Sequence, residues 1–152
     1  MTIVGQLIGA GKTKEAKRYV WLFTGTVMVL QVFTNSILYA VHTPIFSLFG
    51  LGSQTAEIAN QLLLSITIVV PVLWAASFTI PAGLRAAGDV KFPMVISIGT
   101  MWLGRVLLGY LLGVKFGMGA LGIWIGMYLD WLLRAPIYVF RLRRREFKKL
   151  IR

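Results

Sequence analysis

The chain has 152 residues, of which 57% are apolar and 14% charged, and its mean hydropathy is +0.77. These values lie outside the range of soluble domains and indicate an all-α integral membrane protein. The net charge of +11 does not indicate a nucleic-acid partner, because the basic residues form no surface with interleaved aromatics, and the absence of cysteine excludes disulfides and thiolate metal sites.

Residues 1–18 are predicted to be a cytoplasmic N-terminal segment. Residues 3–10 are apolar but too short to cross a bilayer, so we expect them to be the end of a preceding helix of a longer chain. A basic linker follows. Its sequence around residues 9–13, GAGKT, matches a phosphate-binding loop only in part, because the first glycine of that pattern would fall at Gln6. We interpret it as a cytoplasmic turn.

Four apolar runs are each long enough to cross the hydrocarbon layer at 1.5 Å per residue. The predicted spans of this 19–140 transmembrane region are residues 19–41, 58–80, 93–114 and 119–140. Pro71 is expected to kink the second span, and Pro81 with Gly83 to end it. Asp89 is expected to cap the third span. Because the connections are short, consecutive spans are expected to be antiparallel, up-and-down neighbours.

Lysine and arginine are distributed unevenly between the two sides of these spans. Four precede the first span, none separates the first from the second, two separate the second from the third, and one separates the third from the fourth. The positive-inside rule then places both termini in the cytoplasm. We therefore predict a multi-pass protein of the inner or plasma membrane.

Residues 141–152 form a basic tail, with Phe147, Leu150 and Ile151 on one face of an expected helix. This pattern fits an amphipathic helix that lies on anionic membrane lipid. It fits equally well a solvated flank that follows the last span.

Three charged residues fall inside the predicted spans: Arg105 in the third, and Asp130 and Arg134 in the fourth. Charges in hydrocarbon are costly and are expected to pair. Arg105 and Asp130 should lie at nearly the same depth, and Arg134 lies one helical turn from Asp130. We expect one cluster, which either lines a polar transport cavity or locks two helices together.

Two amides, Gln31 and Asn35, share one face of the first span. Amides that face lipid lack hydrogen-bond partners, so we expect these side chains to line a cavity or to face a neighbouring helix. His42 has no carboxylate or cysteine nearby and is interpreted as an interfacial residue rather than a metal ligand. No serine or threonine lies in a recognisable motif with a base, so no enzyme activity, metal site or cofactor is predicted.

Glycines with GxxxG spacing occur in the last two spans. The pairs are Gly109 with Gly113, and Gly122 with Gly126. This spacing lets helix backbones approach closely. We therefore predict tight contact between the third and fourth spans on the extracellular side of Asp130.

Four segments resemble the C-terminal part of the MATE (multidrug and toxic compound extrusion) transporters. They are VGQLIGAGKTKEAKR (4–18), GLRAAGDVKFPM (83–94), WLGRVLLGYLLG (102–113) and GALGIWIGMYLDWLLRAPIYVFRLRR (119–144). The resemblance implies that the four spans are the ninth to twelfth helices of a twelve-helix, two-lobed fold. It also implies the export of small cationic or amphipathic substrates in exchange for Na⁺ or H⁺. The glycines that match the linkers of that family are Gly5, Gly9, Gly11 and Gly88.

An alternating-access cycle needs two lobes that move around one site. The resemblance therefore implies a fragment, one chain of a split transporter, or an oligomer that rebuilds the missing wall. In each case the chain works with the remaining helices or with a second chain. The family's coupling carboxylates lie mainly before this segment or in the tenth helix, and the second span here contains none. The alternative is a small structural or assembly protein of the membrane without transport of its own.

Overall fold

The computed structural model describes residues 1–144, which are helical apart from short turns and include no strand. The α-helices are α1 (Thr2–Gly9), α2 (Thr13–Ala40), α3 (His42–Leu48), α4 (Ser53–Ala86), α5 (Lys91–Thr100) and α6 (Gly119–Arg144). Beyond Thr100 the chain continues as two π-helical segments, η1 (Met101–Leu108) and η2 (Leu111–Lys115). The prediction of an all-α fold is confirmed.

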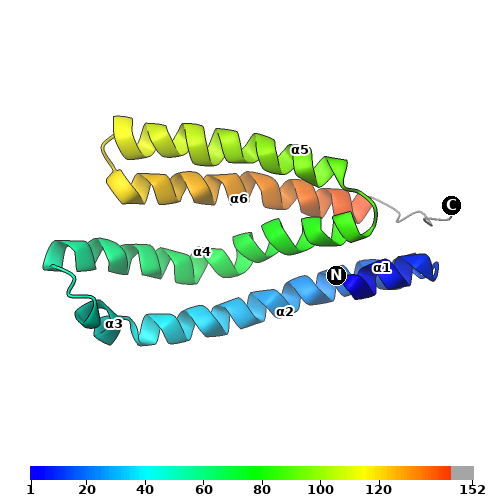
Figure 1. Cartoon of the computed structure of the whole chain (residues 1–152), viewed down its shortest axis with the longest axis horizontal. Coiled ribbons are helices and arrows are strands. Elements are labelled where there is room, and N and C mark those ends of the chain that lie inside the picture. The colour runs from blue at the N-terminus through cyan, green and yellow to red at the C-terminus, as the bar shows by residue number, and fades with distance from the viewer. Residues whose placement is uncertain (145–152) are drawn as a thin grey trace.

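The long helices lie side by side in one layer, in the spatial order α2, α4, α6 and α5 (Figure 1). Successive long helices run in opposite directions, as expected for an up-and-down arrangement. However, α6 lies between α4 and α5, which contact each other mainly where the chain passes from one to the other. The expectation that consecutive spans are packed neighbours is therefore wrong for this pair. One side of α6 packs on α4, where Ser77 donates to the carbonyl of Trp131, and the other side packs on η1 and η2.

Three helical stretches are long and apolar enough to cross a membrane within the described part of the chain: Thr13–Ala40, Ser53–Ala86 and Lys91–Lys115. The chain is thus a multi-pass membrane protein. α6 has 26 residues and lies along the same layer, but Asp130 and Arg134 lower its hydropathy. It stays a predicted fourth span.

α4 is longer than the second predicted span, and it changes direction about halfway along (Figure 1). Pro71 lies near the middle of its sequence. It continues through Pro81 and Gly83 to Ala86, so the expectation that these two residues end the helix is wrong. A proline inside a helix costs about 3 kcal/mol. Ile80 and Leu84, on either side of Pro81, are completely buried, so packing against the neighbouring helices supports this part of α4.

The turns that end α1 and α4 have the same geometry. Gly11 and Gly88 have φ values of 76° and 80°, and the amide of the next residue donates to a carbonyl five positions earlier, Lys12 to Leu7 and Asp89 to Leu84. This is the Schellman motif, which favours glycine because its left-handed conformation strains other residues. The N-cap of α5 is Val90, so the prediction that Asp89 occupies this position is off by one residue. Because Gly88 is in the left-handed conformation, α5 begins one residue later than expected.

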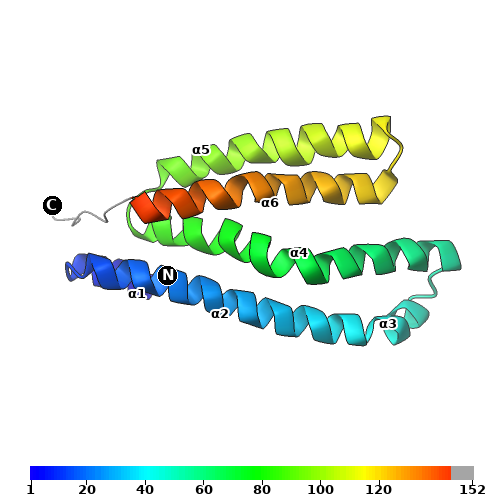
Figure 2. The same ribbon diagram turned by 180° about the vertical axis from the view of Figure 1, so that it is seen from behind.

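The buried apolar cluster of the described residues lies at one end of the layer, where α1 packs beside α2 and where α4 and α6 end (Figure 2). Its fully buried members include Val20, Ile80, Leu84, Tyr138 and Leu142. We call this the basic end, because the positively charged linkers and the arginines at the end of α6 lie here. A Cβ at Gly83 would lie 2.6 Å from Cγ2 of Val20, so this glycine lets α2 and α4 pack closely at the basic end.

Candidate functional site

The charged residues of α6 lie on the face that meets η1, where the two backbones nearly touch. Asp130 and Arg134 are four residues apart and therefore share one face of the helix. A Cβ added to Gly104 of η1 would lie 2.7 Å from Cα of Asp130. Only glycine at position 104 allows this approach, and the close approach excludes lipid from the carboxylate.

Asp130 and Arg134 form a direct, buried ion pair. Nη2 of Arg134 donates to Oδ1 of Asp130 at 2.7 Å and to Oδ2 at 2.9 Å, and the Asp130 side chain is 0% exposed. The same guanidinium also donates to α5, from Nε to Oγ1 of Thr100 at 3.2 Å and from Nη2 to the carbonyl of Ser97 at 3.3 Å. Ser97 and Thr100 were not among the predicted site residues. Their only signal in the sequence is that they are polar residues one to two turns before Arg105 on the same span.

Arg105 occupies the edge of this cluster. Its Nη2 lies 3.9 Å from Oδ2 of Asp130, and its side chain is 43% exposed. The structure therefore brings all three charged residues together but couples them unequally. Arg134 satisfies the carboxylate, whereas Arg105 adds a more distant positive charge.

The four glycines expected at the contact of the last two spans lie where η1 and η2 cross α6. A Cβ on Gly126 would lie 2.7 Å from Cα of Gly109, and one on Gly122 would lie 2.6 Å from the amide nitrogen of Gly113. Gly104 joins this contact although it is five residues from Gly109. A π-helix bonds each residue to the fifth along the chain, so residues at this spacing stack, which an α-helical reading of the sequence misses.

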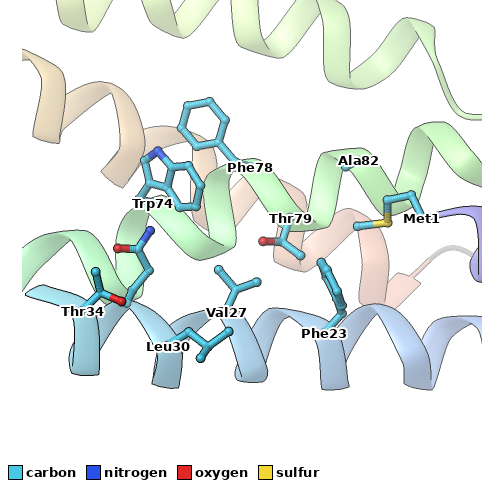
Figure 3. Close-up of a pocket in the computed structure, with 10 residues that line it drawn as sticks. Met1, Phe23, Val27, Leu30, Thr34, Trp74, Phe78, Thr79 and Ala82 are labelled. Carbon is cyan, nitrogen blue, oxygen red and sulfur yellow. The ribbon is translucent and has the colours of Figure 1, made fainter.

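A pocket of about 470 Å³ lies between α2 and α4 (Figure 3). Side chains from α2, among them Phe23 and Val27, point toward Thr79 of α4, and Met1 lies at the α1 end. The lining residues are Met1, Phe23, Val27, Leu30, Gln31, Thr34, Trp74, Phe78, Thr79 and Ala82. Such a volume, with a mostly apolar and aromatic wall and a few polar groups, is typical of small-molecule sites.

The two candidate cavity residues of α2 are bonded to each other. Nδ2 of Asn35 donates to Oε1 of Gln31 at 3.1 Å. Gln31 lines the pocket, whereas Asn35 is buried outside the lining. Gln31 is thus the polar side chain that the pair presents to the pocket. The buried Asn35 amide has its hydrogen-bond partner in Gln31.

An aromatic bridge connects the pocket with the ion pair. Phe78 lines the pocket, stacks on Trp74 at a centroid distance of 5.0 Å, and has Cζ of Arg134 5.8 Å from its ring centre. Trp131 of α6 meets the same ring edge-on. The guanidinium is therefore screened from the pocket by a phenyl ring, with a cation–π contact between them.

The remaining candidate residues were expected in the linker turns. Gly11 and Gly88 lie in turns and close the Schellman motifs, whereas Gly5 and Gly9 are helical residues of α1, so the expectation is wrong for these two. Asp89 accepts a hydrogen bond from Nε of Arg141 at 3.1 Å, which ties the α4–α5 turn to α6.

His42 begins α3, where its Nδ1 is hydrogen-bonded to the carbonyl of Tyr39. The described residues contain no group of three or more histidine, cysteine or acidic side chains that is able to hold a metal.

A family model described as MatE matches residues 1–111. A probable multidrug resistance protein NorM of Halalkalibacterium halodurans is 28% identical over 98% of this chain and 33% of its own length. An uncharacterized transporter, YisQ of Bacillus subtilis, is 37% identical over 64% of this chain and 22% of its own length. A probable NorM of Thermotoga maritima is 27% identical over 90% of this chain and 29% of its own length.

The chain spans about a third of the length of the curated relatives that it matches most fully. No solved structure matches it significantly.

Proposed function

The chain belongs to the MatE family, and from this premise we propose that it forms part of a multidrug efflux transporter in a cell membrane. The observation that carries the proposal is the family match over residues 1–111, which include α2, α4, α5 and η1. Two relatives named as probable multidrug resistance proteins match nearly the whole chain. The proposed role is transport and not enzymatic catalysis.

The pocket between α2 and α4 is the proposed contact surface for the cargo. Aromatic side chains, Phe23, Trp74 and Phe78, offer flat faces that attract organic cations and stack on apolar rings. Gln31 and Thr79 add hydrogen-bonding groups. This combination suits small cationic or amphipathic compounds of varied shape.

The driving ion is proposed to be Na⁺ or H⁺, with its carboxylates supplied mainly from outside this segment. Within α4 the only acidic residue is Glu57, near the start of the helix. Asp130 is already neutralised by Arg134. We therefore propose that the remaining helices, or a second chain, complete the transporter.

The ion pair is proposed to act as a structural lock between α5 and α6. Asp130 is completely buried, and neither Asp130 nor Arg134 lines the pocket. Every polar contact of Arg134 described above goes to α5 or α6. A group that binds and releases a coupling ion needs access to water, which Asp130 lacks in this conformation.

The proposed topology has both termini in the cytoplasm of an inner or plasma membrane. Its support is the basic end, where residues 12–18, the linker before α5 and the end of α6 carry most of the positive charge. The rival function, a structural or assembly protein without transport, uses the same topology.

The function is tested in bacterial cells that lack their own multidrug pumps. Cells that produce the tagged chain should accumulate less of a fluorescent organic cation than control cells. When the ion gradients are collapsed, the accumulation should rise to the level of the control cells. Native mass measurement in mild detergent should find the chain in a larger assembly. Unchanged accumulation together with a lone monomer would favour the rival function.

A further inference from the structure

A second groove, of about 520 Å³, is lined by residues at the start of α5 and in the last turns of α6. These two segments lie at the basic end (Figure 2). Its lining residues are Phe92, Pro136, Ile137, Phe140, Arg141 and Arg144. The groove is separate from the pocket between α2 and α4, with which it shares no lining residue.

The lining changes from apolar to cationic along α6. Pro136, Ile137 and Phe140 form the apolar part, and Arg141 and Arg144 follow directly. From residue 136 to residue 144 the helix rises about 12 Å. This length matches the upper part of an acyl chain followed by a phosphate group.

Both arginines lie over aromatic rings. Cζ of Arg141 lies 4.4 Å from the ring centre of Phe92, and Cζ of Arg144 lies 4.2 Å from that of Phe140. Arg141 is fixed further by its bond from Nε to Asp89, yet its side chain stays 39% exposed. Arginines oriented in this way are suited to donate several hydrogen bonds to phosphate oxygens.

We propose that this groove binds one anionic phospholipid of the leaflet at the basic end. The acyl chain packs against Ile137 and Phe140, and the phosphate lies beside Arg141 and Arg144. The charge argues for this occupant: Asp89 balances Arg141, and Arg144 leaves the groove with a net positive charge. The apolar half argues against a free phosphate. The proposal rests on the membrane topology and not on transport, so its test does not depend on efflux.

The test uses the purified chain in phosphatidylcholine nanodiscs with a minor fraction of phosphatidylglycerol that carries a photoreactive acyl chain. After irradiation, the labelled residues are mapped by mass spectrometry. Labelling should concentrate at Ile137 and Phe140. The variant Arg144→Gln should lower it about tenfold, the effect expected when a charge-assisted hydrogen bond to the phosphate is lost.

Arg143→Gln is the matched control. It removes the same charge one residue away, but Cζ of Arg143 lies 5.9 Å from the Trp21 ring and outside the groove lining. Labelling at Ile137 and Phe140 should stay within twofold of the unmodified chain. Ile137→Trp, which fills the groove without a change of charge, should abolish labelling at Phe140.

Three results would overturn the proposal. The first is labelling spread evenly over the lipid-facing residues of all long helices. The second is an equal loss with Arg143→Gln and Arg144→Gln, which indicates only general attraction to anionic lipid. The third is cross-linking of the groove to residues 145–152 in place of lipid, which identifies the chain's own tail as the occupant.

Discussion

Nη2 of Arg134 donates to both carboxylate oxygens of Asp130, at 2.7 and 2.9 Å, while Nε of the same side chain donates to Thr100 on α5. One guanidinium therefore neutralises the buried charge of α6 and binds α6 to its neighbour. An ion pair of this kind is costly to break from one side, because the other charge stays buried without a partner.

Asp130→Asn should destabilise the protein by about 3 to 5 kcal/mol, because it leaves Arg134 charged and unpaired. The loss is measured by unfolding in a denaturing detergent and by the yield in the membrane fraction. Asp130→Asn combined with Arg134→Met should recover a large part of the stability, since no buried charge then remains. Normal stability of Asp130→Asn with loss of efflux would instead make Asp130 a transport group.

Arg105→Gln should change the unfolding free energy by about 1 kcal/mol or less, because a part-exposed pair at 3.9 Å is weak. The same unfolding assay provides the comparison with Asp130→Asn. A loss as large as that of Asp130→Asn would show that Arg105, and not Arg134 alone, holds the carboxylate.

Gly126→Ala should destabilise the contact of η1 with α6 by about 1 to 3 kcal/mol, the usual cost of overpacking. The new Cβ would lie 2.7 Å from the Gly109 backbone and 2.9 Å from the Gly104 carbonyl, so a helix must move. Gly99→Ala is the control in the neighbouring α5, where a Cβ meets nothing within 4 Å. It should be neutral or stabilising by up to about 1 kcal/mol. Equal effects of the two variants in thermal unfolding would refute the close crossing.

Gly11→Ala should cost about 1 to 2 kcal/mol, because alanine is strained at a φ of 76°. Gly9→Ala, two residues earlier, has no left-handed φ and no atom within 4 Å of the new Cβ, so it should cost little. Thermal unfolding of the two variants side by side measures the difference. Similar melting temperatures would argue against the Schellman turn after α1.

Val27→Trp should reduce efflux of an organic cation by filling the pocket between α2 and α4, with little change in stability. Val29→Trp is the control on the same helix, since Val29 is 69% exposed and lies outside the pocket lining. Accumulation of the fluorescent cation, normalised to the amount of protein in the membrane, gives the readout. Equal efflux by both variants would exclude this pocket from the transport path.

Parts of the architecture could be predicted because they depend on spacing within one helix. Asp130 and Arg134 face the same way at a separation of four residues, and Gly122 and Gly126 do so for the same reason. The alternation of helix direction follows from the number of apolar runs and their short connections. The family resemblance, confirmed by the match over residues 1–111, depends on linker motifs that are local in sequence.

The parts of the architecture that could not be predicted depend on which helix faces meet. The position of α6 between α4 and α5 arises from bonds on its second side, such as Ser65 to Tyr128 at 2.7 Å and Ser77 to the carbonyl of Trp131 at 3.1 Å. Neither serine lies in a motif. The π-helical turns change which residues of the third span share a face, so the contact of Gly104 with Asp130 could not be read from an α-helical period.

We propose above that this chain is part of a cation-coupled efflux transporter. The most direct measurement is the movement of a fluorescent organic cation in proteoliposomes that contain the chain together with whatever copurifies with it, under an imposed Na⁺ or proton gradient. We expect gradient-dependent movement that Val27→Trp suppresses and Val29→Trp does not. No movement under either gradient, from a chain that runs as a folded monomer, would contradict the claim.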